Sequence, residues 1–255
     1  MNEIKRLKYS DMQSGYHDPD GARMKNFLAC WKEQAMNFRY REKSDEFTGY
    51  ENNSADGDKF QGKFTPSILN FYKEAKQIGW FSAFDVEYGN RFKNIDNINK
   101  FSVAEPMDYE ILKSIFGDED PPDYRYYIYN KSQGGSSSDL YRGRDFDAML
   151  TIGGEGQGII YNAISNEKSL DGEYQIFYYD PHNSAIRFKS FAHLLVFLYL
   201  GEYQKLRKNN GSFGGMFGFK GDWKDTCVPL LFDMNEIESW GKRVPEDDYR
   251  APFSS

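Results

Sequence analysis

The chain has 255 residues, of which 39% are hydrophobic and 17% aromatic, and its formal net charge is −7. So large a share of aromatic side chains excludes an intrinsically disordered protein and can form the core of one large domain. The acidic balance argues against a nucleic-acid-binding protein, because affinity for phosphates depends on lysine and arginine.

The cysteines and the N-terminus bear on the compartment. Cys30 and Cys227 are the only two cysteines, too few for a disulfide framework, so we expect reduced, partly buried thiols in a reducing compartment. The first residues are polar and lack the apolar centre of a signal peptide. The longest apolar stretch, residues 191–200, is about half as long as a membrane span. These features predict a cytoplasmic protein with no membrane partner.

The first third of the chain predicts helices. Residues 20–43 carry apolar side chains close to a 3.6-residue period, with Asp20 as the expected N-cap. Thr65 and Pro66 suit the cap and first turn of a second helix, which we expect to end at Gly79. A shorter helix is predicted over residues 107–116, and the polar residues 44–63 are interpreted as a loop.

From residue 124 onwards the pattern favours strands. They are predicted over residues 124–130, 147–152, 158–164 and 173–179, with turns at Gly153-Gly154 and over 180–183. This order predicts an antiparallel meander, and the fold class is α+β. A buried helix from Ser190 to about residue 207 follows. Beyond a glycine-rich loop at 211–221 we expect a strand over 226–232 and a short helix over 234–240.

The sequence predicts no catalytic residues, no metal site and no cofactor. The glycines of Ile152–Gly158 have GxGxG spacing and precede a strand pattern, whereas a dinucleotide site needs GxGxxG before a helix. None of the three histidines, His17, His182 and His193, stands at metal-ligand spacing from another ligand, and His193 is expected to be a hydrogen-bonded core residue.

An acidic run is the most distinctive feature of the charge pattern. Residues 105–123 contain seven acidic side chains and one basic side chain, Lys113. Such a run is either a solvated loop or an acidic face for a basic partner protein, whose encounter it would steer. The candidate partner-binding residues are Asp118, Glu119, Asp120, Asp123, Tyr124, Tyr127 and Glu155.

The region from Met149 to Leu200 resembles the core of the SMI1/KNR4 family, also called the SUKH superfamily. The resemblance is carried by Ile152-Gly153-Gly154, Gly156-x-Gly158, Tyr179-Asp180, and Ser190-Phe191 with Leu194-Leu195. The helix from Thr65, with Gly79-Trp80 after it, is similar to the family's early helix, so the resemblance extends over residues 64–206.

The resemblance implies a SUKH-like α+β core at residues 64–206, preceded by a helix and polar loop at 1–63 and followed by a C-terminal extension at 207–255 packed on the core. It implies a non-catalytic binding protein, similar to immunity proteins that neutralise bacterial toxins, often nucleases. The alternatives are a regulatory or scaffold protein of cell-wall signalling, or an uncharacterised small-ligand binder or enzyme with a pocket near His182 or the loop at 211–221. The oligomeric state is not predicted.

Overall fold

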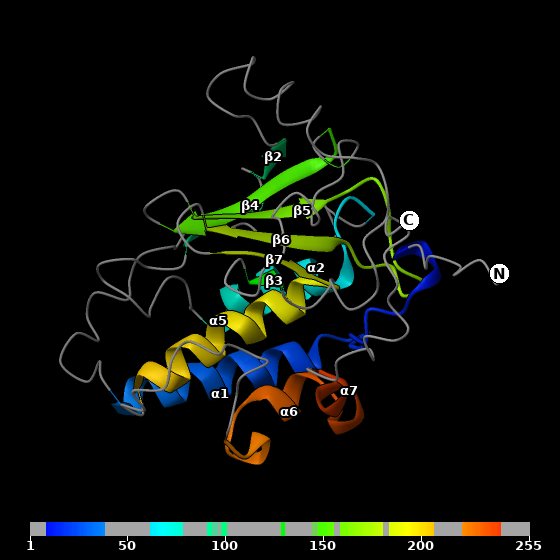
Figure 1. Ribbon diagram of the computed structural model, residues 1–255. Helices are drawn as coiled ribbons and strands as arrows, with labels where there is room; N and C mark the ends of the chain where they lie inside the picture. Colours follow the sequence, from blue (N-terminus) through cyan, green and yellow to red (C-terminus); the bar gives the residue numbers. More distant parts are fainter. Residues whose placement is uncertain are drawn as a thin grey trace, which may run out of the picture.

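The computed structural model describes residues 9–38, 62–78, 91–93, 95, 98–100, 129–130, 145, 147–155, 159–180, 184–206 and 221–240. These residues form one antiparallel sheet with helices gathered on one of its faces (Figure 1), which confirms the α+β class. Among the helices so described, none has the length and apolar character that a membrane span requires.

The centre of the sheet is an antiparallel meander, as expected, but its fourth strand, at 184–188, was not predicted, and the strand expected over 124–130 is described only as a short edge strand. Its four strands pair in chain order and antiparallel: β4 (Met149–Glu155), β5 (Ile159–Ile164), β6 (Gln175–Asp180) and β7 (Ser184–Phe188). Three short strands lie at the edges. Both β1 (Arg91–Phe92) and β2 (Asn99–Lys100) pair with β4, and β3 (Tyr129–Asn130) pairs with β7.

The predicted turn at Gly153-Gly154 is wrong, because β4 continues through both glycines to Glu155. Gly153 is opposite Phe92 on one neighbouring strand and Tyr161 on the other. The rings of Phe92 and Tyr161 contact each other, with centroids 5.7 Å apart. Because Gly153 has no side chain, the rings of Phe92 and Tyr161 can approach each other across β4. The register shift between Thr151 and Gly153 is the kind of irregularity that often accompanies a glycine within a strand.

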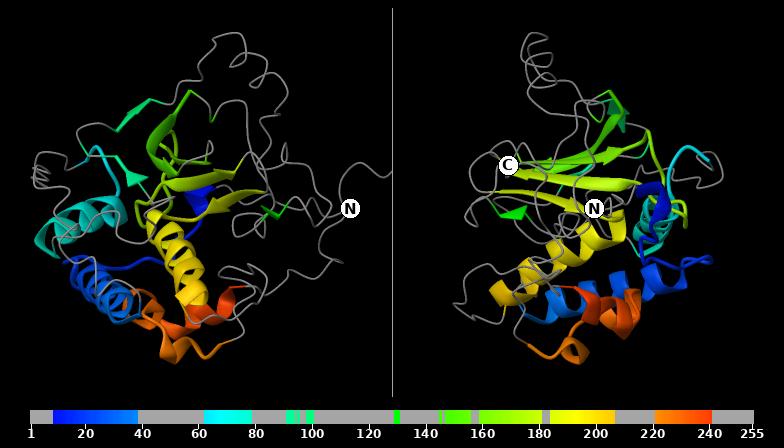
Figure 2. Two further views of the ribbon diagram at one scale, coloured as in Figure 1. Left: turned by 90° about the vertical axis from the view of Figure 1, so that its left-hand side faces the viewer. Right: turned by 45° about the vertical axis from the view of Figure 1, so that its right-hand side comes forward.

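Helix α5 (Phe191–Leu206) lies between the sheet and the outer helices (Figure 2). Its first ten residues are all buried, as the apolar sequence predicted. On the sheet side, Phe197 packs on Tyr178 and Phe188. Helix α2 (Pro66–Ile78) lies beside α5, and it begins at the predicted proline. Both helices therefore bury one face of the sheet.

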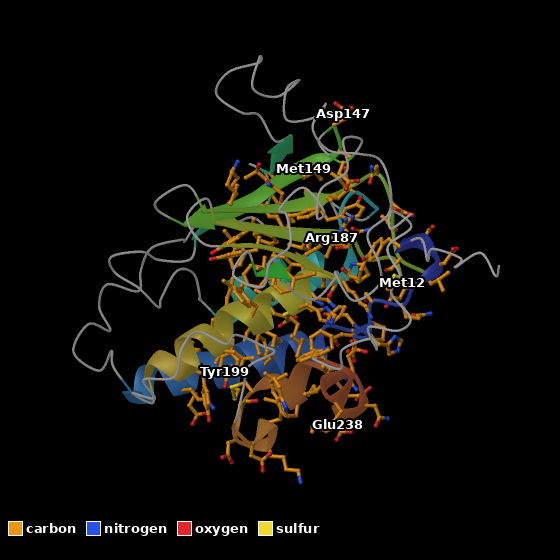
Figure 3. All side chains as sticks on the ribbon, in the orientation of Figure 1. Met12, Asp147, Met149, Arg187, Tyr199 and Glu238 are labelled. Atoms are coloured by element: carbon orange, nitrogen blue, oxygen red, sulfur yellow. A yellow bond between two sulfur atoms is a disulfide. The ribbon has the colours of Figure 1, made fainter. Side chains whose placement is uncertain are left out.

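The outer helical layer comes from the two ends of the chain. Helix α1 (Ala22–Phe38) packs with α6 (Val228–Leu231), and α7 (Met234–Ser239) follows α6 (Figure 1). The side chain of Tyr199 on α5, labelled in Figure 3, lies on the α1 side of that helix. Its ring packs on Phe27 and Trp31 of α1, with centroids 5.5 Å away in both cases. One hydrophobic cluster thus contains described residues from all three predicted parts of the chain.

Several local predictions can be compared with the structure. The N-terminus of α1 is capped mainly by buried Asp18, whose carboxylate accepts hydrogen bonds from the backbone N–H groups of Arg23 and Met24; the expected cap, Asp20, accepts one from Ala22. The strand expected over 226–232 is wrong, because Pro229 stands in the first turn of α6 and favours a helix start. The helix expected over 107–116 lies outside the described residues.

The expectation of reduced cysteines is also wrong. Cys30 of α1 and Cys227, directly before α6, form a disulfide with their Cα atoms 5.8 Å apart. The two residues are separated by 197 positions in the chain. The pairing could not be read from the sequence, because only the packing of α6 on α1 brings the two side chains together.

Candidate functional site

Most of the predicted partner-binding residues lie outside the described part of the chain. This applies to Asp118, Glu119, Asp120, Asp123, Tyr124 and Tyr127. The backbone of Glu155 is described, at the last position of β4 and opposite Ile159. The predicted strand at 124–130 is described only at Tyr129–Asn130, which do form a strand, β3.

Glu155 and β3 lie at the same end of the sheet. Glu155 pairs with Ile159 at one hairpin end, Asp180 pairs with Ser184 at the next, and Ser184 pairs with Asn130. The segment with the acidic run connects β2, which pairs with β4, to β3, which pairs with β7. These two anchoring strands are five strand spacings apart, or roughly 24 Å at about 4.8 Å per spacing.

A group of polar side chains lies on the sheet face opposite α2 and α5. Asn162, Phe177 and Arg187 occupy one cross-strand row of that face. Arg187, which Figure 3 labels on the sheet, is fully buried; it donates through Nε to Gln175 Oε1 and holds its guanidinium 4.9 Å from the centre of the Phe177 ring. Its Nη2 lies 3.5 Å from Oδ2 of Asp145, which is also fully buried. We call these five residues the polar sheet-face cluster.

Two atoms of the polar sheet-face cluster lack a hydrogen-bond partner. Asn162 Oδ1 and Gln175 Nε2 are both buried, and neither makes a hydrogen bond within the structure as described. One is an acceptor and the other a donor, on neighbouring strands and diagonal to each other in the β5–β6 register. A bound water or a small polar ligand between them could satisfy both.

A serine, a histidine and a carboxylate meet beneath α7. Ser190 Oγ lies 2.8 Å from His193 Nδ1, and His193 Nε2 lies 3.5 Å from Glu236 Oε1. Hydrolases arrange a nucleophile, a base and a carboxylate in this order. Here Ser190 and His193 have no exposed surface, and Phe232 and Trp240 pack on the imidazole with ring centroids 4.5 and 5.6 Å away. In this conformation no substrate could reach the hydroxyl.

The charge states of this group follow from its burial. Desolvation lowers the pKa of His193 and so favours the neutral imidazole. For Glu236, burial acts to raise the pKa, but the hydrogen bond and charge attraction of His193, with the hydrogen bond from Trp240, outweigh burial, and the net pKa is lowered. Burial thus favours a neutral His193, while the attraction between His193 and Glu236 favours the ionised carboxylate. The prediction that His193 is a hydrogen-bonded core residue is confirmed.

A second buried carboxylate, Glu173, holds the start of α2. The backbone N–H of Ser67 donates to Glu173 Oε1 at 2.8 Å, and the Ser67 hydroxyl donates to Oε2 at 2.5 Å. Burial raises the pKa of Glu173 to about 7, although these two hydrogen bonds act to lower it. Beside it, Asp171 accepts from both the N–H and the hydroxyl of Ser14, which ties the N-terminal segment to the same loop.

Sequence reasoning missed these three groups for different reasons. Ser190 and His193 are three positions apart at a helix start, a spacing visible in the sequence, but Glu236 joins them only through the fold. Arg187 lies in β7, a strand that was not predicted, on the face opposite Phe188, and its burial depends on the neighbouring strands. Within the described ranges, no group of three or more His, Cys, Asp or Glu side chains is placed to hold a metal ion. His182 and residues 211–220 of the glycine-rich loop, which could have marked a pocket, lie outside those ranges.

Comparison of the chain with protein-family models, with curated protein sequences and with solved structures found no match.

Proposed function

We propose that this chain is a non-catalytic binding protein of SMI1/KNR4 type, acting as an immunity-like protein that neutralises a toxin domain with a basic surface. The observation that carries the proposal is the anchoring of the acidic run. The segment that contains it leaves the sheet at β2 and returns at β3, on opposite edges of the meander. Binding residues are commonly found on segments that a rigid scaffold holds at both ends.

The size of the sheet suits a protein partner. The strands that anchor the acidic segment are roughly 24 Å apart. A standard protein interface buries about 800 Å² on each side, a patch about 30 Å across. The distance between the two anchoring strands is comparable with the width of one such patch. The charge of the acidic segment would raise the association rate and select a basic partner, and aromatic anchors such as Tyr124 and Tyr127 would supply affinity.

The compartment of this activity is a separate question. The cytoplasmic location expected from the N-terminal sequence stays a prediction. The Cys30–Cys227 disulfide weighs against it, because cytosolic thiols are kept reduced.

The experiment is a pull-down of the full chain with the product of the adjacent toxin gene. Three reversals in one variant, Asp118→Lys, Glu119→Lys and Asp120→Lys, should weaken binding at least tenfold at low salt, mainly by slowing association. Raising the ionic strength should weaken wild-type binding in the same direction, because exposed charges are screened.

The matched control carries the same change of charge on the helical layer. Glu33, Asp225 and Glu238 are exposed on or near α1, α6 and α7, and their replacement by lysine should leave binding within twofold of wild type. Equal binding by the two triple variants would refute the acidic-face proposal. A gene neighbourhood without any toxin would favour the alternative of a regulatory or scaffold protein.

A further inference from the structure

We infer that this protein functions in an oxidising compartment, outside the reducing cytosol, and that its partner is a protein acting in that same compartment. The second half rests on the proposed function; the first half does not. The observation is the disulfide between Cys30 and Cys227, which uses both cysteines of the chain. Disulfides persist in secreted, periplasmic and surface proteins and are rare where glutathione and thioredoxin keep thiols reduced.

The surroundings of the disulfide distinguish a structural bond from a redox switch. Cys227 is fully buried within the main hydrophobic cluster, and Cys30 packs against the same cluster. The backbone N–H of Cys227 donates to the hydroxyl of Tyr199 at 2.9 Å, and this hydroxyl in turn donates to Gln34 of α1. Reactive and regulatory cysteines are partly exposed so that an exchanging thiolate can reach them. Cys227, one half of this bond, has no exposed surface, and Cys30 is partly buried; the structural role is therefore inferred from the buried half and from the hydrogen bonds through Tyr199.

The position of the bond in the fold supports the same conclusion. It joins α1 to the residue directly before α6; α6 packs on α1, and α1 packs on α5. Aromatic contacts of α1 with α5, such as Phe27 with Tyr199, hold Cys30 in place. On the Cys227 side, Leu231 and Phe232 pack in the same hydrophobic cluster. The bond therefore closes the outer helical layer and forms part of the finished fold.

The chemistry of bond formation needs an electron acceptor. The two thiols lose two protons and two electrons when the S–S bond forms. By thiol–disulfide exchange, a protein disulfide oxidant accepts these electrons and leaves as a dithiol. Such oxidants act in the compartments where stable disulfides are made.

This location limits the partner. A toxin that cuts nucleic acid in the cytosol would be out of reach of a protein confined to an oxidising compartment. The partner class indicated here is a basic protein whose own substrate lies in the cell envelope or outside the cell. The proposed function by itself allowed a nuclease toxin as the partner. An oxidising location excludes a toxin whose substrate is nucleic acid in the cytosol.

The test measures location and thiol state without any binding step. Cells that make the full chain from its own gene are quenched in acid and fractionated, and free thiols are tagged with a maleimide polymer before and after reduction. We expect the chain in the extracytosolic fraction, with no tag before reduction and two tags after it, one for each cysteine. Full-length chain with Cys30→Ala and Cys227→Ala should carry no tag under either condition.

Two results would overturn the inference. Chain in the cytosolic fraction that takes two tags before reduction would show that the bond does not form where the protein works. Cytosolic chain that takes none would show a cytosolic disulfide and an intracellular partner. Neither result affects the acidic-face proposal, which the charge-reversal pull-down tests separately. Conversely, loss of that proposal would leave the fractionation result intact.

Discussion

Removal of the Cys30–Cys227 disulfide should cost a large part of the stability of this fold. The bond closes a loop of 197 residues. The chain-entropy relation assigns to such a loop a restriction of about 18 cal/mol/K in the unfolded chain, or about 5 kcal/mol at 25 °C. Domains are stable by about 5–15 kcal/mol, so the reduced protein should be marginal. Reduction keeps both sulfur atoms in the core and therefore isolates the effect of the cross-link.

The assay is urea unfolding followed by tryptophan fluorescence, with and without a phosphine reductant. For an m-value of about 3 kcal/mol/M, the midpoint should fall by close to 2 M on reduction. The variant with Cys30→Ala and Cys227→Ala should unfold at or below the midpoint of the reduced protein and should not respond to the reductant. A loss of less than about 1 kcal/mol on reduction of the wild type would refute the reasoning, because the cross-link would then not restrict the unfolded chain.

Three further predictions concern buried groups. Burial raises the pKa of Glu173 from 4.5 to about 7. The stability that depends on this shift is fully present below pH 4.5 and is lost as the pH rises through 7. Glu173→Gln should remove on the order of 3 kcal/mol of this pH dependence, measured by urea unfolding at several pH values. Gly15→Ala should destabilise the protein by about 2–4 kcal/mol in thermal unfolding, because the residue has φ +84° and a Cβ would collide with the Glu236 carboxylate. The control, Gly172→Ala, has φ +86° but no atom near its Cβ position, and it should cost about 1 kcal/mol. Asp145→Asn should cost about 3 kcal/mol by leaving the Arg187 charge poorly compensated, and an unchanged midpoint would show that the pair contributes nothing.

Much of the fold was predictable because local patterns of apolar and turn-forming residues specify its helices and strands. The period of apolar residues predicted α1 and α2, and Pro66 marked the start of α2 correctly. The all-round apolar character of residues 191–200 predicted a buried helix, and α5 is covered by the sheet on one side and by α1 on the other. Strand patterns separated by short turns predicted an antiparallel meander and the order of its first three central strands, whereas β7 was not predicted.

The errors occurred where a local preference conflicts with tertiary packing. Gly153 and Gly154 favour a turn by themselves, yet they lie within a strand because Phe92 and Tyr161 pack across them. Residues 226–232 have a strand-like composition, but their apolar side chains bury themselves as a short helix against α1.

The candidate sites divide in the same way. The acidic run is a property of composition, so its charge and its attraction for a basic partner were available from the sequence. Its attachment to opposite edges of one sheet was decided by strand pairing. The burial of Glu173, the neutral His193 facing Glu236 and the disulfide each join residues distant in the chain. Hydrophobic periodicity and turn chemistry act over a few residues and therefore determine elements; contacts between remote residues exist only after the elements pack, and these contacts decide the pKa values and the cross-link.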